Sequence, residues 1–362
     1  MGLLFLLCMI KSEYHVVGVM SGTSLDGIDL VQVKFYFEGF WRFEILAAET
    51  IAYPKKWRDT LRNLVSLSLE DLKKIDEDYT EFLALTIKEF IFKNDIKNVD
   101  AICSHGHTAL HQPEKRLTLQ IGNLPEIAKI LNEIVVCDFR VEDVKLGGQG
   151  APLVPIGDKL LFSEYDFCLN LGGFANISTE IKQSRIAYDI CPVNIVLNHY
   201  VSQLGFDFDD GGQIASSGKL DTTLLYQLND LNFYAQKHPK SLGLEWVRTN
   251  IFPLIDIFKL EVKDVLNTFV EHIAVQIASV IKQKNDASVL VTGGGAYNKY
   301  LMERIKFHSK SKIIIPVNQV VEFKEALVFG FLGVLKLRGE VNCLHSVTGA
   351  SKDHSSGIIY HP

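Results

Sequence analysis

The chain of 362 residues is long enough for two domains of ordinary size. A hydrophobic content of 47% with 22% charged residues is typical of a globular protein in water. The net charge of −6, with no stripe of lysine and arginine, argues against nucleic-acid binding. The six cysteines form no Cys-x-x-Cys pair, which favours free thiols in a reducing cytoplasm over a disulfide framework or a zinc site.

The first ten residues resemble a signal sequence only superficially. Gly2–Ile10 is apolar, but no positive charge precedes it and no small-residue cleavage site follows it. The stretch is also too short to span a bilayer. We interpret it as an over-long start, with Met9 as a candidate initiator, and expect no membrane-spanning segment elsewhere and no membrane partner.

The first half of the chain predicts the element order β-β-β-α-β-α-β. Alternating apolar residues and short apolar runs predict the strands, and apolar residues near a 3.6-residue period predict the helices. The expected strands are 14–19, 30–37, 40–51, 99–103 and 133–138. The expected helices run from Pro54 to about residue 65, onward from about residue 69, and after Asn123, with Pro125 in the first turn.

The second half repeats this order without repeating the sequence. Residues 166–178 predict a strand, a glycine turn and a second strand, and 185–189 a third. A helical insertion is expected over 193–258, and the remaining elements are a helix at 262–282, a strand at 288–292, a helix at 299–306, a strand at 313–316 and a helix at 322–337. The predicted fold class is α/β, with two ribonuclease-H-like domains and a nucleotide cleft between them, as in sugar kinases, actin and chaperone ATPases. We expect domains at 1–140 and 141–362, with the final helix, about 322–338, packing back onto the first.

The turn between the first two strands is the first candidate for binding a phosphate. Its glycines let backbone N–H groups point at one spot, and the hydroxyls of Ser21, Thr23 and Ser24 can join them. Asp26 and Asp29 can hold Mg²⁺ or its waters. An ordinary polar hairpin turn is the alternative reading.

A third glycine turn, at Gly293–Asn298, ends a strand and opens a helix. Its amides and the helix N-terminus can meet an anionic or ribose group, although a plain tight turn explains Gly-Gly-Gly as well. P-loop and Rossmann glycine motifs are absent. Glycine turns at three equivalent strand ends together predict a nucleotide site.

Ten segments resemble the anhydro-N-acetylmuramic acid kinases, and together they cover nearly the whole chain from about Tyr14. They are Gly18–Asp29, Ser104–Thr108, Thr118–Asn123, Asp138–Arg140, Gly147–Pro155, Asn170–Ser178, Asp210–Gly212, His238–Ser241, Thr292–Gly295 and Ser346–Ala350. The resemblance implies a cytoplasmic, homodimeric enzyme of peptidoglycan recycling that uses ATP and Mg²⁺. It would add water to 1,6-anhydro-N-acetylmuramic acid while phosphorylating the freed 6-oxygen.

The nucleotide-binding residues expected on these grounds lie in the three turns. They are Gly22, Thr23, Ser24, Leu25, Asp26, Gly27, Ile28, Asp29, Gly172, Gly173, Gly293, Gly294, Gly295 and Asn298, with Asp26 also proposed to hold Mg²⁺ through water.

By resemblance, the base that activates water is Asp189. The family pattern there is Asp-x-Gly-Pro-x-Asn, and this chain keeps Asp189, Pro192 and Asn194 but has Cys191 in place of the glycine. Since glycine tolerates dihedral angles that cysteine does not, the substitution puts the shape of the pocket in doubt. A strand-end aspartate that caps the next helix is the alternative. Glu325 is a second catalytic candidate, and an ordinary first-turn glutamate is its alternative.

The substrate contacts are expected from polar residues around two of these segments. Arg140 suits a lactyl carboxylate, which it could hold with two hydrogen bonds. Hydroxyl or acetamido groups could be bound by His105, Asp143, Gln149 and Asn194. His107 stands where the family carries glutamine, so a hydrogen-bonding role is favoured over a metal site formed with His105 and His111, which no acidic residue accompanies.

Two other classes of function stay open on the sequence. One is a nucleotide-binding regulator or chaperone-like ATPase on the same fold, since a fold does not determine function. The other is a kinase of a different sugar, or an ATP-dependent ring-opening amidohydrolase. The cluster from Arg140 to Pro155 together with Asp189 favours a small-molecule pocket.

Overall fold

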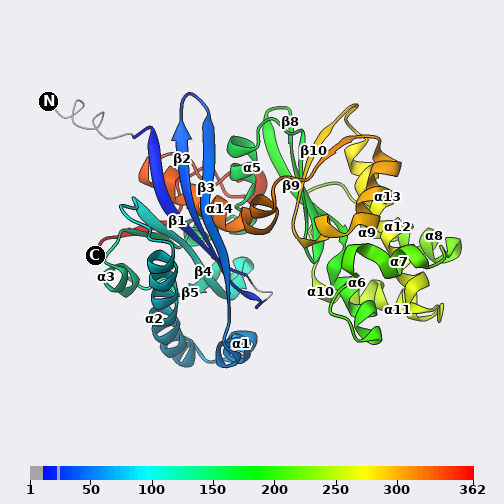
Figure 1. Ribbon diagram of the computed structural model, residues 1–362, viewed down its shortest axis with the longest axis horizontal. Coiled ribbons are helices and arrows are strands. Elements are labelled where there is room, and N and C mark those ends of the chain that lie inside the picture. Colours follow the sequence, from blue (N-terminus) through cyan, green and yellow to red (C-terminus); the bar gives the residue numbers. More distant parts are fainter. Residues whose placement is uncertain (1–10, 23–24) are drawn as a thin grey trace. The chain divides into compact units, whose positions relative to one another are not determined.

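The computed structural model describes residues 11–22 and 25–362, and its ribbon is drawn in Figure 1. The stretch Gly2–Ile10, with the candidate initiator Met9, lies outside the described residues, as do Thr23 and Ser24. The chain divides into two compact units. The first contains Met1–Leu161 and Phe323–Pro362, and the second contains Phe162–Glu322.

The boundaries of these units differ from the expected division at residue 140. Residues 141–161 belong to the first unit because their side chains are bound to its C-terminal segment. A buried ion pair joins Asp158 Oδ1 to Lys324 Nζ at 2.6 Å, and a Cβ on Gly157 would lie 2.6 Å from the side chain of Val328. The second boundary falls inside helix α14 (Asn318–Leu337), where Phe323 has non-helical dihedral angles.

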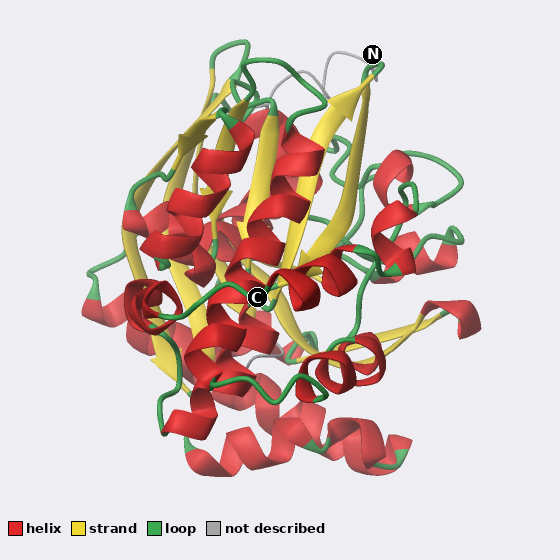
Figure 2. Ribbon diagram, turned by 90° about the vertical axis from the view of Figure 1, so that its right-hand side faces the viewer, coloured by secondary structure: helices red, strands yellow, loops and turns green. Residues whose placement is uncertain are grey.

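The first unit is built on a seven-stranded sheet in the order β12-β6-β4-β1-β2-β3, with β5 paired to β4. Strands β1 (Glu13–Ser21), β2 (Gly27–Phe37) and β3 (Trp41–Ala52) are antiparallel. Strands β4 (Ala101–Gln112) and β6 (Val135–Cys137) run parallel to β1, and β12 (Ile358–Tyr360) closes the edge antiparallel to β6. Figure 2 colours the strands of the chain yellow and its helices red.

Alternate residues of β1 face two different layers of helix. Val17 and Val19 pack in a core with α2 (Leu69–Lys93), whose Ser68 N-cap accepts a hydrogen bond from the Asp71 N–H. On the other face α14 approaches so closely that a Cβ on Gly18 would lie 2.1 Å from the carbonyl oxygen of Ala326. The shorter helices of this unit are α1 (Lys55–Arg62), α3 (Glu126–Leu131), α4 (Val141–Lys145), α5 (Pro155–Leu161) and α15 (His345–Thr348).

Strand β4 is longer than the sequence predicts. The expected strand ended at residue 103, but β4 continues to Gln112 and forms a hairpin with β5 (Leu117–Ile121). The prediction was wrong because Ser104–Thr108 is polar and contains glycine, a composition typical of a loop. Here Ser104, His105 and His107 are buried, and hydrogen bonds of their side chains replace those to water.

The second unit has a five-stranded sheet in the order β11-β10-β7-β8-β9. Strands β7 (Phe167–Leu171), β8 (Phe174–Ile181) and β9 (Ser184–Pro192) are antiparallel, and β10 (Ser288–Thr292) and β11 (Lys312–Ile314) continue the sheet parallel to β7. Helix α13 (Lys299–Ser309) connects β10 to β11. The expected helical insertion consists of the short helices α6 (Asn194–Val201), α7 (Gln213–Ser217), α8 (Thr222–Asn229), α9 (Asn232–Ala235), α10 (Leu244–Asn250) and α11 (Phe252–Asp256).

Helix α12 (Val262–Ile281) is the central helix of the second unit's core. By length and composition it could cross a membrane, but 78% of its most apolar window is buried inside the structure. Burial of this kind is expected of the core helix of a globular domain.

Both sheets place three antiparallel strands beside two parallel ones in the same order. If the hairpin strand β5 and the edge strand β12 are left out, the order numbered along each half is 3-2-1-4-5, the arrangement of a ribonuclease-H-like domain. The α/β class and the pair of ribonuclease-H-like units are therefore confirmed.

Candidate functional site

Two glycine turns of the second unit lie against each other. Strands β7 and β10 are parallel neighbours, so the turns that follow them leave the same edge of the sheet. Gly293 has a φ of +82°, and a Cβ there would lie 2.7 Å from Asn170 Oδ1; a Cβ on Gly295 would lie 2.7 Å from Leu171 Cβ. These two positions require glycine, because a side chain would separate the turns.

The start of α6 is attached to the same turns. The Val193 N–H donates to Gly173 O at 2.8 Å, and the Asn194 side-chain amide donates to Leu171 O at 3.4 Å. The structure thus brings together Gly172, Gly173, Gly293, Gly294, Gly295 and Asn194. Asn298, also expected here, caps α13 by accepting a hydrogen bond from the Leu301 N–H at 2.9 Å, so its oxygen has a local structural use.

A row of polar residues crosses four strands just before these turns. Thr292 is paired with Asn170, Asn170 with Asn176, and Asn176 with Asp189. Paired residues of a sheet point to the same face, so the row presents hydroxyl, amide and carboxylate groups together. Asn170, Asn176 and Thr292 lie in motifs noted in the sequence, but the sequence did not predict that they form one polar row. The available signal was asparagine inside predicted strands, where that residue is rare.

Asp189 is held by the loop that contains the His238–Ser241 motif. Its N–H donates to Lys240 O at 3.1 Å, and its Oδ2 accepts from the Leu242 N–H at 2.7 Å. No hydrogen bond of Oδ1 is recorded within the described part of the chain. Burial raises the pKa of Asp189, and the Leu242 N–H partly offsets that rise. In this arrangement Oδ2 of Asp189 is held by a hydrogen bond, and Oδ1 is left available as a basic oxygen.

The backbone of Cys191 is extended. It lies within β9, paired with Ala175, and it is absent from the residues with positive φ. An extended backbone suits cysteine as well as glycine, so Cys191 itself is not in a strained conformation. The irregularity of this strand lies at Ile190, where the register with β8 shifts. All five described cysteines are buried.

The turn between β1 and β2 supplies the candidates of the first unit. Leu25 adopts a left-handed conformation with φ of +63°, and a Cβ on Gly27 would lie 2.5 Å from Ile51 O. Ile28 is buried in the sheet core, so its side chain has a structural use. Asp26 is exposed, while Asp29 Oδ1 accepts a hydrogen bond from Thr50 Oγ1 at 2.6 Å. Asp26 is therefore the better placed carboxylate for a hydrated cation.

Beneath this turn lies a buried hydrogen-bond network centred on Ser21. Its hydroxyl is 2.7 Å from His107 Nδ1 and also contacts the hydroxyls of Tyr53 and Tyr79. Burial lowers the pKa of His107 to about 4, so the ring is neutral near pH 7. Ser21 is only 1% exposed and its hydroxyl is engaged in this network, so a part of that hydroxyl in a phosphate site stays a prediction.

Arg140 and His105 are joined directly. Arg140 Nε donates to His105 Nε2 at 2.8 Å, and Arg140 Nη1 donates to Gly150 O at 2.7 Å. His105 Nδ1 is 2.8 Å from Gly106 O, so both ring nitrogens of His105 have partners. His105 therefore orients Arg140, and Nη2 of Arg140 has no recorded hydrogen bond within the described residues.

Asp143 is buried and both of its carboxylate oxygens accept hydrogen bonds within the first unit, so its expected role as a substrate ligand stays a prediction. Its side chain is completely buried, with Oδ2 accepting from the Gly150 N–H and Oδ1 from Thr348 Oγ1, each at 2.7 Å. A sequence pattern does not show whether the side chain of an aspartate is buried. The neighbouring Gln149 is exposed and donates its backbone N–H to Thr348 O at 2.8 Å. Burial lowers the pKa of Arg140, and the charge of Glu325 on α14 partly offsets that lowering.

The comparison with known families matches the chain over nearly its whole length. A family model described as anhydro-N-acetylmuramic acid kinase covers residues 14–362. The chain belongs to the anhydro-N-acetylmuramic acid kinase family. The expected family and the expected kinase class are confirmed.

Individual relatives agree with the family match. The anhydro-N-acetylmuramic acid kinase of Sulfurimonas denitrificans is 31% identical over 371 residues, which cover 96% of this chain and 100% of that protein. The one from Pseudomonas syringae pv. syringae is 33% identical over 372 residues, with coverage of 96% and 99%. Among solved structures, component A of (R)-2-hydroxyglutaryl-CoA dehydratase from Acidaminococcus fermentans is similar with a TM-score of 0.48 and 9% identity, covering 90% of this chain and 100% of that one.

Proposed function

We propose that this kinase hydrates 1,6-anhydro-N-acetylmuramic acid and phosphorylates it at the 6-oxygen, using ATP. The observation that carries the proposal is the family match over residues 14–362. In the reaction, water attacks the anomeric carbon and the bond from that carbon to the 6-oxygen breaks. The freed 6-oxygen forms a bond to the γ-phosphorus, and the bond from that phosphorus to ADP breaks.

Asp189 is the proposed general base, which takes the proton of the attacking water. The fixed Oδ2, bound to the Leu242 N–H, orients the carboxylate, and Oδ1 is left to accept the proton. Partial burial supports this role, since a raised pKa brings the base closer to the operating pH. No separate acid is required, because the departing oxygen goes directly to phosphorus. Glu325 is the second candidate base.

The glycine turns are the proposed ATP-binding elements. In the second unit, Gly172, Gly173 and the Gly293–Asn298 turn offer backbone N–H groups where no side chain fits. In the first unit, the Gly22–Asp29 turn is the proposed phosphate contact, with Asp26 holding Mg²⁺ through water. When bound, Mg²⁺ neutralises charge on the phosphates. The exposed Asp26 carboxylate fits an ion of that kind, because Mg²⁺ prefers oxygen ligands and keeps several waters.

Arg140 is proposed to bind the lactyl carboxylate of the sugar. Its Nε and one Nη1 hydrogen are occupied by His105 and Gly150, which leaves the Nη1–Nη2 end for a carboxylate. Gln149 and Asn194 remain proposed contacts to hydroxyl or acetamido groups. We further propose a cytoplasmic homodimer without nucleic-acid or membrane partners; light scattering of the purified chain tests the dimer.

The deciding experiment measures ADP release with 1,6-anhydro-N-acetylmuramic acid, with 1,6-anhydro-N-acetylglucosamine and with N-acetylmuramic acid. We expect turnover with the first sugar to exceed that with the others, and mass spectrometry to place phosphate on the 6-oxygen with one added water oxygen. Incubation in ¹⁸O-labelled water should put the label at the anomeric position. A label on the phosphate, or equal turnover without any anhydro sugar, would contradict the proposal.

A further inference from the structure

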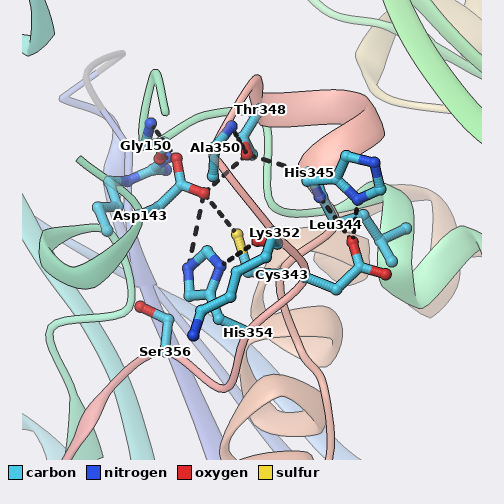
Figure 3. Close-up of polar contacts among 12 residues, drawn as sticks. Asp143, Gly150, Cys343, Leu344, His345, Thr348, Ala350, Lys352, His354 and Ser356 are labelled. Atoms are coloured by element: carbon cyan, nitrogen blue, oxygen red, sulfur yellow. Dashed lines mark hydrogen bonds and ion pairs between the residues drawn. The ribbon is translucent and has the colours of Figure 1, made fainter. Parts of the chain in front are cut away.

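Three potential metal ligands meet in the first unit, outside the proposed catalytic site. They are Asp143 of α4, Cys343 after α14 and His354 near the C-terminus, and one ligand atom of each lies within 4.8 Å of the others. Figure 3 shows the carboxylate, the thiol and the imidazole pointing toward one another. Asp143 Oδ1 is 3.0 Å from Cys343 Sγ and 3.6 Å from His354 Nε2. The fold brings these residues together from distant parts of the chain.

The Nε2 atom of His354 has no hydrogen-bond partner among the described residues. His354 Nδ1 lies 3.1 Å from the carbonyl oxygen of Lys352, and a carbonyl can only accept, so Nδ1 carries a proton. In the neutral ring, Nε2 then bears a lone pair. This atom is buried without a hydrogen bond, in a side chain only 8% exposed, and it faces Asp143 Oδ1 at a distance too long for a hydrogen bond.

Without a cation, Asp143 Oδ1 accepts hydrogen bonds from Cys343 Sγ and Thr348 Oγ1, and a cation placed among the three ligand atoms would also pair with the lone pair of His354 Nε2. A cation fits this position better than a local rearrangement, because Asp143 and His354 are already fixed by other contacts. Lys352 O orients the imidazole, the Gly150 N–H holds Asp143 Oδ2, and Thr348 Oγ1 donates to Oδ1. Outer contacts of this kind normally orient metal ligands in proteins.

We propose that Asp143, Cys343 and His354 form a binding site for a transition-metal ion of the Zn²⁺ type. Thiolate, imidazole and carboxylate are the ligand set that Zn²⁺ takes, with a fourth position left for water or another oxygen. One carboxylate and one thiolate balance the charge of a divalent ion, so the occupied site is neutral. The thiol proton leaves to solvent when the Sγ–metal bond forms.

A bound metal would hold in place the residues that support Arg140, the arginine proposed to bind the sugar, so this consequence rests on the proposed function. It joins α4 to the C-terminal segment, and Asp143 also holds Gly150, whose carbonyl accepts a hydrogen bond from Arg140. Metal binding should therefore stabilise the fold and keep Arg140 in position. The sequence shows no sign of a zinc site, because only ligands that are close together in the chain, such as a Cys-x-x-Cys pair, can be recognised from their spacing.

Titration of the chelator-treated full chain with Co²⁺ tests the site, because a thiolate–cobalt bond gives near-ultraviolet charge-transfer absorption. We expect about one Co²⁺ per chain, displacement by Zn²⁺, and a rise in melting temperature on loading. The charge-transfer absorption should disappear in Cys343→Ser. In His354→Gln the affinity for Co²⁺ should fall strongly. Cys168→Ser, a buried cysteine of β7, and His345→Gln, an exposed imidazole nearby, serve as matched controls and should behave as the parent protein.

The site is wrong if Co²⁺ gives no charge-transfer band, or if the band persists in Cys343→Ser. It is also wrong if His345→Gln weakens binding as much as His354→Gln. Should Cys343→Ser fail to fold, the comparison of the two histidine variants still decides, because both retain the thiol. A protonated His354 paired with Asp143, without metal, would show as a melting temperature that does not respond to Co²⁺ or Zn²⁺.

Discussion

The backbone N–H of Leu242 donates to Asp189 Oδ2 at 2.7 Å, across 53 residues of sequence. Because Lys240 O also accepts from the Asp189 N–H, both ends of this residue are fixed by the same loop. The loop follows α9 and is part of the helical insertion, so the insertion positions the proposed base Asp189. A general base must be held in place without losing its free lone pair, and this geometry meets both conditions.

The first prediction concerns the pH dependence of turnover. Burial raises the pKa of Asp189, and a base is inactive when protonated, so activity should fall as the pH drops through this raised value. We expect the acid limb of log kcat/KM at a higher pH than an ordinary aspartate would give. Measurement between pH 4 and 9 checks this, and the limb should vanish in Asp189→Asn. An acid limb that persists unchanged in that variant would assign the titration to another group.

The second prediction concerns stability and Asp138. Burial raises the pKa of Asp138 to about 6, against a usual value near 4. Its contribution is therefore present below pH 4 and is lost as the pH rises through 6, when the buried group must ionise. Asp138→Asn keeps an acceptor for the Asn123 side-chain amide, 3.0 Å away, and removes this charge.

We expect Asp138→Asn to raise the free energy of unfolding at pH 7.5 by about 1–3 kcal/mol. The gain should shrink toward zero at pH 4. Urea denaturation at both values measures it, with the exposed Asp59→Asn as a control that should change stability by less than about 0.5 kcal/mol. A gain that is equal at both pH values would exclude ionisation as its cause.

The sequence predicted the two repeated halves well because they depend on local signals. Alternation along residues 30–37, the helical period of residues 262–282 and the glycine turns each reflect one element or one turn. The strand order then follows from the repeated β-β-β-α-β-α-β pattern. These features place Asp189, Asn194 and the second-unit glycines without any knowledge of tertiary contacts.

The features that the sequence did not predict depend on contacts between distant residues. Polar Ser104–Thr108 forms strand because Ser21 and Arg140 satisfy two of its histidines. Asp143 is buried because Thr348 and Cys343, about two hundred residues away, contact it. No local pattern distinguishes such a carboxylate from one that faces a substrate.

The third prediction concerns the choice between sugars. Arg140→Lys removes the planar fork and its hydrogen bonds to His105 and Gly150, which an ammonium group cannot reproduce. We expect KM for 1,6-anhydro-N-acetylmuramic acid to rise by roughly 10- to 100-fold, with KM for ATP unchanged. Any slow turnover of 1,6-anhydro-N-acetylglucosamine, which lacks the lactyl carboxylate, should be unaffected. Equal losses with both sugars would show that Arg140 supports the loop rather than the carboxylate.

The fourth prediction concerns Mg²⁺ and Asp26. Asp26→Ala removes an exposed carboxylate proposed to hold the waters of the ion. We expect the Mg²⁺ concentration for half-maximal activity to rise several-fold, with KM for the sugar unchanged. The exposed Asp95→Ala is the control for a general loss of negative charge in the first unit. Normal activity of Asp26→Ala at limiting Mg²⁺ would remove this residue from the site.

The last prediction is that Asp189→Asn lowers kcat without weakening binding. Asparagine keeps the shape and can still accept the hydrogen bond from the Leu242 N–H through its Oδ1, but it has no basic oxygen for the water proton. Loss of a general base typically lowers the rate by about 10²–10⁴-fold. Because the proton is transferred only in the transition state, the dissociation constants of ATP and sugar should stay within about threefold of the parent values.

Asp256→Asn is the matched control for Asp189→Asn. Its carboxylate also accepts one hydrogen bond, from Tyr200 OH at 2.9 Å, in the same unit but outside the proposed site. We expect that control to keep its turnover. If Asp189→Asn also retains turnover within about threefold, another group activates the water, and Glu325→Gln becomes the deciding variant, because Glu325 is the remaining carboxylate proposed for this role.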